Sequence, residues 1–227
     1  MKNKKHKIIL ISFIVIEILL CILVQLTGGI LNTIVSFGAV VIAFIYSFLN
    51  FNKPKQFITY GLFATVCADI FLVVLNPMKQ SLAMIFFSIT QICYFIHIFN
   101  NQDKKYKLIN IVTRIVIVLI VFIITIVVLK ENTDFLSLIS MFYYANLIMN
   151  IIFSLLMIEK NYIFTLGLIF FACCDLLIGL SIMQDQYLPV KEGTIIYFLA
   201  NPGFNLAWLF YVPSQTLISL YSKKQAD

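Results

Sequence analysis

Long apolar blocks separated by short polar connections make up almost the whole chain. A bilayer core of about 30 Å is crossed by a helix of about 20 apolar residues. The pattern therefore predicts eight membrane-spanning helices, at residues 8–26, 30–50, 57–75, 81–99, 108–129, 135–158, 162–183 and 194–221. No connection is long enough to hold a soluble domain, so residues 1–227 are expected to form a single integral-membrane domain.

Composition supports the same fold class. Of the 227 residues, 62% are hydrophobic and 11% are charged, whereas soluble domains have about 45–50% apolar and about 25% charged residues. A water-soluble fold could not cover this much apolar surface, so we expect an all-α polytopic membrane protein. The first block is too long for an ordinary signal peptide and no A-x-A cleavage site follows it, which indicates an uncleaved first helix.

Lysines predict the orientation, because basic residues accumulate on the cytoplasmic side of a membrane. Twelve lie at the N-terminus, in alternate connections and in the tail: Lys2, Lys4, Lys5, Lys7, Lys53, Lys55, Lys104, Lys105, Lys107, Lys160, Lys223 and Lys224. Only Lys79, Lys130 and Lys191 lie on the other side. This asymmetry predicts both termini in the cytoplasm, with the chain in a cell membrane, the cytoplasmic membrane if the source is bacterial. Arg114, just inside the fifth block, is expected to extend its side chain to the interface.

The remaining charge and cysteine patterns narrow the function classes. The net charge of +6 is accounted for by topology, and no basic surface interleaved with stacking aromatics indicates a nucleic-acid partner. The five cysteines lie in apolar blocks and are expected to be small buried residues. No His, Cys and carboxylate set has metal-ligand spacing, so neither metal nor cofactor is expected.

Two stretches, GLFATVCADIFLVVL from Gly61 and GLIFFACCDLLIGL from Gly167, place an aspartate eight residues after a glycine. Asp69 and Asp175 are 106 residues apart, and Cys67 and Cys173 match at the same offset. This match predicts a parallel internal repeat of four helices plus four, with halves at about 1–105 and 106–227.

Carboxylates are expensive inside a bilayer, at about 2.5–3.5 kcal/mol each on insertion scales. A matched pair therefore favours a functional site shared by the third and seventh helices. The structural alternative is that each aspartate is a hydrogen-bonding contact between helices. Glu17, in the first block, has no counterpart in the repeat, and both helix packing and cavity lining remain open for it.

Polar residues recur at helical spacing in three later blocks and predict an amphiphilic cavity. The candidates for substrate contacts are Gln91, Tyr94, Tyr143, Asn146, Asn150, Asn205 and Gln215. Ser154, Asn201, Trp208 and His97 extend these stripes. The NPG sequence at 201–203 is expected to break or kink the overlong last helix.

These features together resemble the YhhN-like lysoplasmalogenase family. The resemblance rests on the G-L-x6-D motif ending at Asp69, its repeat ending at Asp175, Tyr94 in the fourth block and the ending YVPSQTLISL. The family pattern has a His three residues before the Tyr of the fourth helix, where this chain has Gln91, with His97 on the other side of Tyr94.

The resemblance implies hydrolysis of the vinyl-ether bond of lysoplasmalogens, with Asp69 and Asp175 as the catalytic pair and a lysophospholipid as substrate. The chemistry suits two carboxyl groups, because vinyl-ether hydrolysis needs an acid to protonate carbon and a carboxylate to stabilise the resulting cation or activate water. A second hypothesis is a secondary transporter or ion-coupled carrier that uses the aspartates as its binding site. A third is a non-catalytic lipid-binding membrane protein. Oligomeric state is left open.

Overall fold

The computed structural model describes residues 2–51, 53–186, 191–200 and 203–222. Its helices are α1 (Lys2–Leu26), α2 (Gly29–Leu49), α3 (Gln56–Asp69), α4 (Gln80–Asn101), α5 (Lys104–Leu129), α6 (Phe135–Leu155), α7 (Ile158–Gln186), α8 (Ile195–Ala200) and α9 (Leu206–Ser222). Three short turns complete the fold: 3-10 turns η1 (Lys53–Lys55) and η3 (Lys130–Asn132), and a π-helical turn η2 (Ile70–Val74).

Among the described residues, seven segments are long and apolar enough to cross a membrane, which confirms an all-α polytopic membrane protein. They are Lys7–Leu26, Gly29–Leu49, Lys53–Val74, Gln80–Asn101, Lys104–Asn132, Phe135–Leu155 and Asn161–Ser181. The eighth predicted span, at 194–221, is instead two helices, because α8 ends at Ala200 and α9 begins at Leu206. Asn201 and Pro202 of the NPG sequence lie outside the described residues. The α9 helix has 17 residues and is therefore about 26 Å long.

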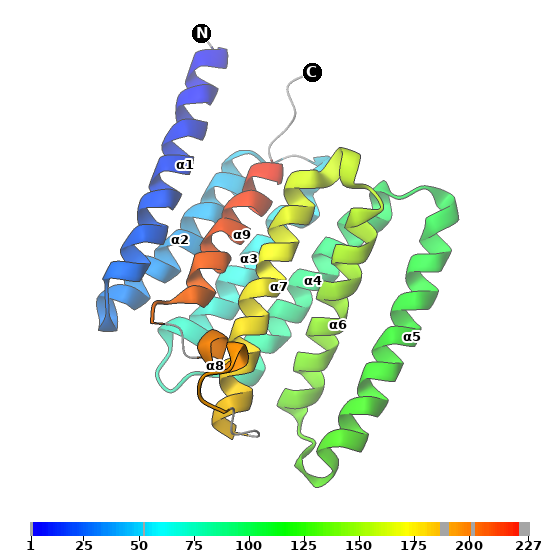
Figure 1. Ribbon diagram of the computed structural model, residues 1–227. Coiled ribbons are helices and arrows are strands. Elements are labelled where there is room, and N and C mark those ends of the chain that lie inside the picture. The colour runs from blue at the N-terminus through cyan, green and yellow to red at the C-terminus, as the bar shows by residue number, and fades with distance from the viewer. Residues whose placement is uncertain (1, 52, 187–190, 201–202, 223–227) are drawn as a thin grey trace.

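The long helices alternate in direction and lie side by side (Figure 1). We call the end of the bundle where α1 begins and α9 ends the terminal end, and the end where α8 lies the far end. Helices α1, α3, α5 and α7 run from the terminal end to the far end, and α2, α4, α6 and α9 return. The predicted count of eight spans and the cytoplasmic location of the termini stay predictions.

Four helix pairs account for much of the packing around the aspartates. The α3 helix packs against α4, as α7 packs against α9. Across the halves, α4 packs against α6 and α2 packs against α9. The α1 and α5 helices lie at the edges of the bundle (Figure 1) and expose many of their apolar side chains, as expected of helices that face lipid.

Gly61 and Gly167 allow close approach of α3 to α4 and of α7 to α9. The Thr90 hydroxyl of α4 donates to the Gly61 carbonyl over 3.1 Å, and the Ser214 hydroxyl of α9 donates to the Gly167 carbonyl over 2.8 Å. A Cβ atom at Gly61 would overlap the Tyr94 ring, and one at Gly167 would lie 2.7 Å from Cγ1 of Ile218. Small residues at such crossings let helix backbones approach in a membrane.

Candidate functional site

Asp69 is the last residue of α3, at the point where the helix widens into the π-helical turn η2. Its side chain is buried, with 1% of its surface exposed. The Tyr211 hydroxyl of α9 donates a hydrogen bond of 2.8 Å to its Oδ2 atom. Single π-helical turns occur frequently at functional sites, and here the turn follows directly on a buried carboxylate.

Asp175 lies within α7 and is half-buried. Its Oδ2 atom accepts a hydrogen bond from the Tyr143 hydroxyl of α6. Each aspartate is therefore hydrogen-bonded to a tyrosine from a different helix.

Aromatic rings connect the two aspartate–tyrosine pairs. The Phe171 ring of α7 lies 6.4 Å from the Tyr143 ring and 5.5 Å from the Tyr211 ring, measured between centroids. Asp69 and Asp175 are close enough to interact electrostatically. The structure thus brings together the two residues that the repeated motif singled out.

Three of the predicted polar residues form a second cluster together with Arg114, which was expected at the membrane interface. Asn150 of α6 donates to the Gln91 side-chain oxygen of α4 over 3.0 Å. The Arg114 guanidinium of α5 donates to the side-chain oxygens of Asn146, over 2.7 Å, and Asn150, over 2.9 Å. Arg114 was expected to extend to the interface, and this was wrong: only 8% of its surface is exposed, because the amide oxygens of α6 hold its head group inside the bundle.

Further contacts extend this cluster toward the terminal end. Asn110 accepts from Arg114 over 3.3 Å and donates to the side-chain oxygen of Gln102 over 3.0 Å. The Phe95 ring lies under the guanidinium, with its centroid 4.3 Å from the central carbon. We call Gln91, Gln102, Asn110, Arg114, Asn146 and Asn150 the Arg114 network.

The remaining predicted contact residues are distributed more widely. Tyr94 is buried against Gly61 and packs edge-on to Phe164, with ring centroids 5.4 Å apart. Gln215 is buried in α9, one turn beyond Tyr211. Asn205 does not lie on a helical stripe, because it precedes α9; it is exposed, and its backbone carbonyl accepts from Gln25 over 3.0 Å.

Two other buried titratable residues lie away from the aspartates. His97 is near the terminal end of α4, where its Nε2 atom lies 3.2 Å from the Tyr221 hydroxyl. Glu17 of α1 is buried beside Thr216 of α9. Neither shares a hydrogen bond with Asp69 or Asp175 in the described part of the chain.

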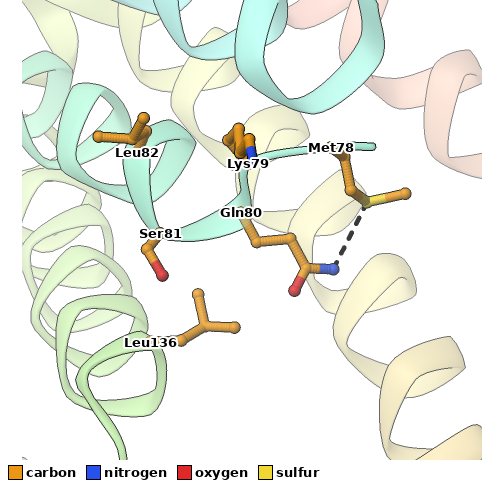
Figure 2. A pocket seen from close by; sticks show the side chains of 6 residues that line it. All are labelled: Met78, Lys79, Gln80, Ser81, Leu82 and Leu136. Atoms are coloured by element: carbon orange, nitrogen blue, oxygen red, sulfur yellow. Dashed lines mark hydrogen bonds between the residues drawn. The ribbon is translucent and has the colours of Figure 1, made fainter. Parts of the chain in front are cut away.

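Two surface cavities lie at opposite ends of the bundle. The cavity at the far end, of about 310 Å³, is lined by Met78, Lys79, the first residues of α4 and Leu136 of α6. Figure 2 shows the Gln80 side chain reaching toward the Met78 sulfur within it. The cavity at the terminal end, of about 290 Å³, is lined by Gln102, Tyr106 and residues of the α6–α7 connection. Neither is lined by an aspartate of the pair.

The described residues contain no group of three or more His, Cys, Asp or Glu side chains arranged to hold a metal ion. The five cysteines are free; Cys174 is buried and the others are half-buried.

Fold and site together define a polytopic helical membrane protein with a pair of carboxyl groups between its helices. A comparison with protein families identifies the class more closely: residues 30–220 match the YhhN family. The chain belongs to the YhhN family. Comparisons with curated proteins and with solved structures found no match.

Proposed function

We propose that this protein hydrolyses the vinyl-ether bond of lysoplasmalogens, releasing a fatty aldehyde and a glycerophospho-base. The observation that carries the proposal is the pairing of Asp69 with Asp175, each hydrogen-bonded to a tyrosine from a different helix. The YhhN family includes lysoplasmalogenases, which supports the same reaction class.

In the proposed reaction one aspartic acid donates its proton to the vinyl carbon remote from oxygen. The adjacent carbon becomes an oxocarbenium ion, which the ionised carboxylate stabilises. Water then adds to this carbon and loses a proton to the carboxylate. The resulting hemiacetal collapses: its hydroxyl proton is passed to the glycerol oxygen, the carbon–oxygen bond to glycerol breaks, and the aldehyde leaves.

Accessibility distinguishes the two carboxyl groups in this scheme. Asp175 is half-buried and Asp69 is almost fully buried. We assign Asp175 as the group that meets the substrate and Asp69 as its enclosed partner. Two neighbouring carboxyl groups in a medium of low dielectric constant titrate as a unit, so a single shared proton suits this division of roles.

We also propose that the chain contains a parallel internal repeat, because residues at matched positions of the two halves make equivalent contacts beside the two aspartates. Gly61, Thr90 and Tyr94 make the contacts that Gly167, Ser214 and Ile218 make in the second half. The α4 and α9 members of these sets differ by 124 residues, and the same offset relates Gln91 to Gln215, both buried. These matches support two four-helix halves, at about 1–105 and 106–227.

The test is aldehyde release from a lysoplasmenyl-ethanolamine by the purified protein, beside Asp69→Asn and Asp175→Asn. Each amide variant is expected to lose roughly 100- to 10,000-fold in rate, the usual contribution of a general acid or base. Glu131→Gln, an equivalent change at an exposed carboxylate of the far end, is the matched control. All four proteins must elute as single species from size-exclusion chromatography in detergent.

A carrier is the second candidate, favoured by the interruption between α8 and α9, because broken helices form the binding sites of many transporters. However, the α4 helix, which is the counterpart of this segment in the first half, is continuous over 22 residues. Wild-type protein that takes lysophospholipid into liposomes without releasing aldehyde, and loses uptake in both amide variants, would favour the carrier and exclude the hydrolase.

A further inference from the structure

Arg114 is a buried cation with no counter-charge among the described residues. Its four hydrogen bonds all go to amide oxygens, from Asn110, Asn146 and Asn150, and the Phe95 ring covers it. None of these partners, within the described ranges, is a carboxylate. Arginine keeps its charge in proteins, and a charge inside a membrane is costly unless it is matched.

The Arg114 network also has more donors than acceptors. Every side-chain amide oxygen in it already accepts a hydrogen bond. Three buried nitrogens have no partner in the part of the chain that the structure describes: Arg114 Nε, Gln91 Nε2 and Gln102 Nε2. All three are donors. An uncompensated positive charge surrounded by free N–H groups is complementary to an anionic oxygen ligand.

The network reaches from the aspartate pair to the surface. Asn146, which holds Arg114, lies three residues beyond Tyr143 on α6, about 4.5 Å along the helix axis, and Tyr143 is hydrogen-bonded to Asp175. At the other end, Gln102, with 7% of its surface exposed, lines the cavity at the terminal end.

We propose that the Arg114 network binds the phosphate group of the lysophospholipid substrate. The site rests on the proposed function for the identity of its substrate. It adds which group of that substrate the protein recognises. A phosphate at Arg114 places the glycerol backbone of the same lipid within reach of Asp175. Arginine suits this role because it keeps its charge, and the unpartnered Nε–H of Arg114 can donate to a phosphate oxygen.

The cavity lining indicates which kind of phosphate is bound. Asp103, Tyr106 and Glu159 line the cavity together with Gln102. Carboxylates repel a free phosphate ion but attract the ammonium group of a phosphoethanolamine or phosphocholine, and an aromatic ring binds such cations as well. The lining therefore favours a zwitterionic lipid head group over inorganic phosphate.

Direct binding tests the proposal without requiring hydrolysis. The probes are a 1-O-alkyl-glycerophosphoethanolamine, which has no vinyl ether to cleave, and the matching 1-O-alkylglycerol, which has no phosphate. Arg114→Gln is expected to weaken binding of the phosphate probe roughly 10- to 100-fold, the loss expected for hydrogen bonds to a charged group. Binding of the alkylglycerol should change less than twofold. Lys104→Gln removes an exposed charge from the same helix and is the matched control.

A second variant keeps the test valid if Arg114→Gln folds poorly. Asn110→Asp places a carboxylate beside Arg114, and the unpartnered Gln102 amide can turn to donate to it. This internal anion should occupy the guanidinium, so the phosphate probe should again bind at least tenfold more weakly, with the alkylglycerol unaffected.

The proposal is overturned if both probes lose affinity equally in these variants, or if neither does. Inorganic phosphate that competes with the phosphate probe at equal affinity would overturn the lipid head group as its source. Arg114-dependent binding without any aldehyde release from the vinyl-ether substrate would exclude the hydrolase but keep the binding site. Aldehyde release that does not depend on Arg114 would exclude the site but keep the hydrolase.

Discussion

Asp69 and Asp175 follow the same glycine–leucine motif in α3 and α7, but their surroundings differ. Asp69 ends an α-helix at a π-helical turn and is almost fully enclosed, with Tyr211 as its partner. Asp175 lies within α7 and is half-buried, with Tyr143 as its partner. Two stretches of similar sequence therefore lie in different environments, one almost fully enclosed and one partly exposed.

The helices that supply the tyrosines account for part of this difference. Tyr211 comes from α9, which packs against α1, α2, α3 and α7 and is therefore central. Tyr143 comes from α6, which packs against α4, α5 and α7 nearer one side of the bundle. The α6 helix also carries Asn146 and Asn150, so polar groups continue from Asp175 to Arg114. Two similar motifs can in this way divide the roles of one site between them.

Lengthening each aspartate by one methylene group should give the largest difference in activity between the two sites. Asp69→Glu overfills an enclosed site and displaces the carboxylate, so aldehyde release should fall roughly 100-fold or more, with a stability loss of about 1–3 kcal/mol. Asp175→Glu has room to adjust and should stay within roughly tenfold of wild type. Equal losses in the two variants, measured by aldehyde release and thermal unfolding in detergent, would contradict the assignment of a closed and an open carboxylate.

Removing the tyrosine hydroxyls should give a smaller difference in the same direction. Tyr211→Phe leaves a buried carboxylate without its donor, which costs about 1–3 kcal/mol and should lower activity roughly 10- to 100-fold. Tyr143→Phe leaves a carboxylate that is only half-buried, so its stability loss should be the smaller one. Tyr162→Phe, at an exposed position of α7, is the control and should behave as wild type in both assays.

Much of the fold could be predicted from the pattern of apolar blocks. Seven of the eight predicted spans correspond to helices of membrane-crossing length, because about 20 consecutive apolar residues allow few other structures. The last block is interrupted between α8 and α9, as the proline of the NPG sequence led us to expect. Neither the exact ends of α8 and α9 nor the exposure of Asn205 followed from that pattern.

Within the candidate site, the sequence indicated residues more reliably than partners. The repeated glycine–aspartate motif indicated both aspartates. The sequence around them did not indicate that Tyr211 and Tyr143 would donate hydrogen bonds to them from other helices. The prediction for Arg114 was wrong because a single arginine near a helix end usually extends to the interface. Asn110, one turn before it on the same face, was the available signal, although a helix stripe alone does not identify the facing helix.

Gly61 and Gly167 allow the two aspartate helices to be compared by their packing rather than by their activity. Gly61→Ala directs a Cβ into the fully buried Tyr94 ring, which is held against Phe164. This change should cost about 1–3 kcal/mol. Gly167→Ala meets Cγ1 of Ile218 at 2.7 Å and the Ser214 carbonyl oxygen at 3.2 Å, which is a smaller overlap, so its cost should be lower.

Thermal unfolding of the purified variants checks this ranking. Gly38→Ala is the control, because a Cβ at that position in α2 has nothing within 4 Å, and it should raise stability by up to about 1 kcal/mol. Gly167→Ala that is more destabilising than Gly61→Ala would show that the α7–α9 contact is the tighter one.

The smallest expected effect concerns the starts of α2 and α6, the helices that precede the two aspartate helices. Asp134 caps α6 by accepting from the Ser137 backbone N–H over 2.8 Å, and the Ser137 hydroxyl accepts from the Asp134 backbone. Gly28 stands at the start of α2, with no side-chain cap. Asp134→Ala should cost about 1 kcal/mol, and Gly28→Asp should gain a few tenths of that.

The pH dependence of stability identifies the Asp134 cap. Hydrogen bonds from the Ser137 backbone N–H, and then from its side chain, hold the pKa of Asp134 below its ordinary value of 3.8. A carboxylate with a lowered pKa stabilises the fold above its ordinary pKa, and this contribution is lost as the pH falls through the lowered value. Wild type and Asp134→Ala should therefore differ in thermal stability at pH 7 and converge toward pH 3. A difference that persists unchanged at pH 3 would mean that the carboxylate is not what stabilises the start of α6.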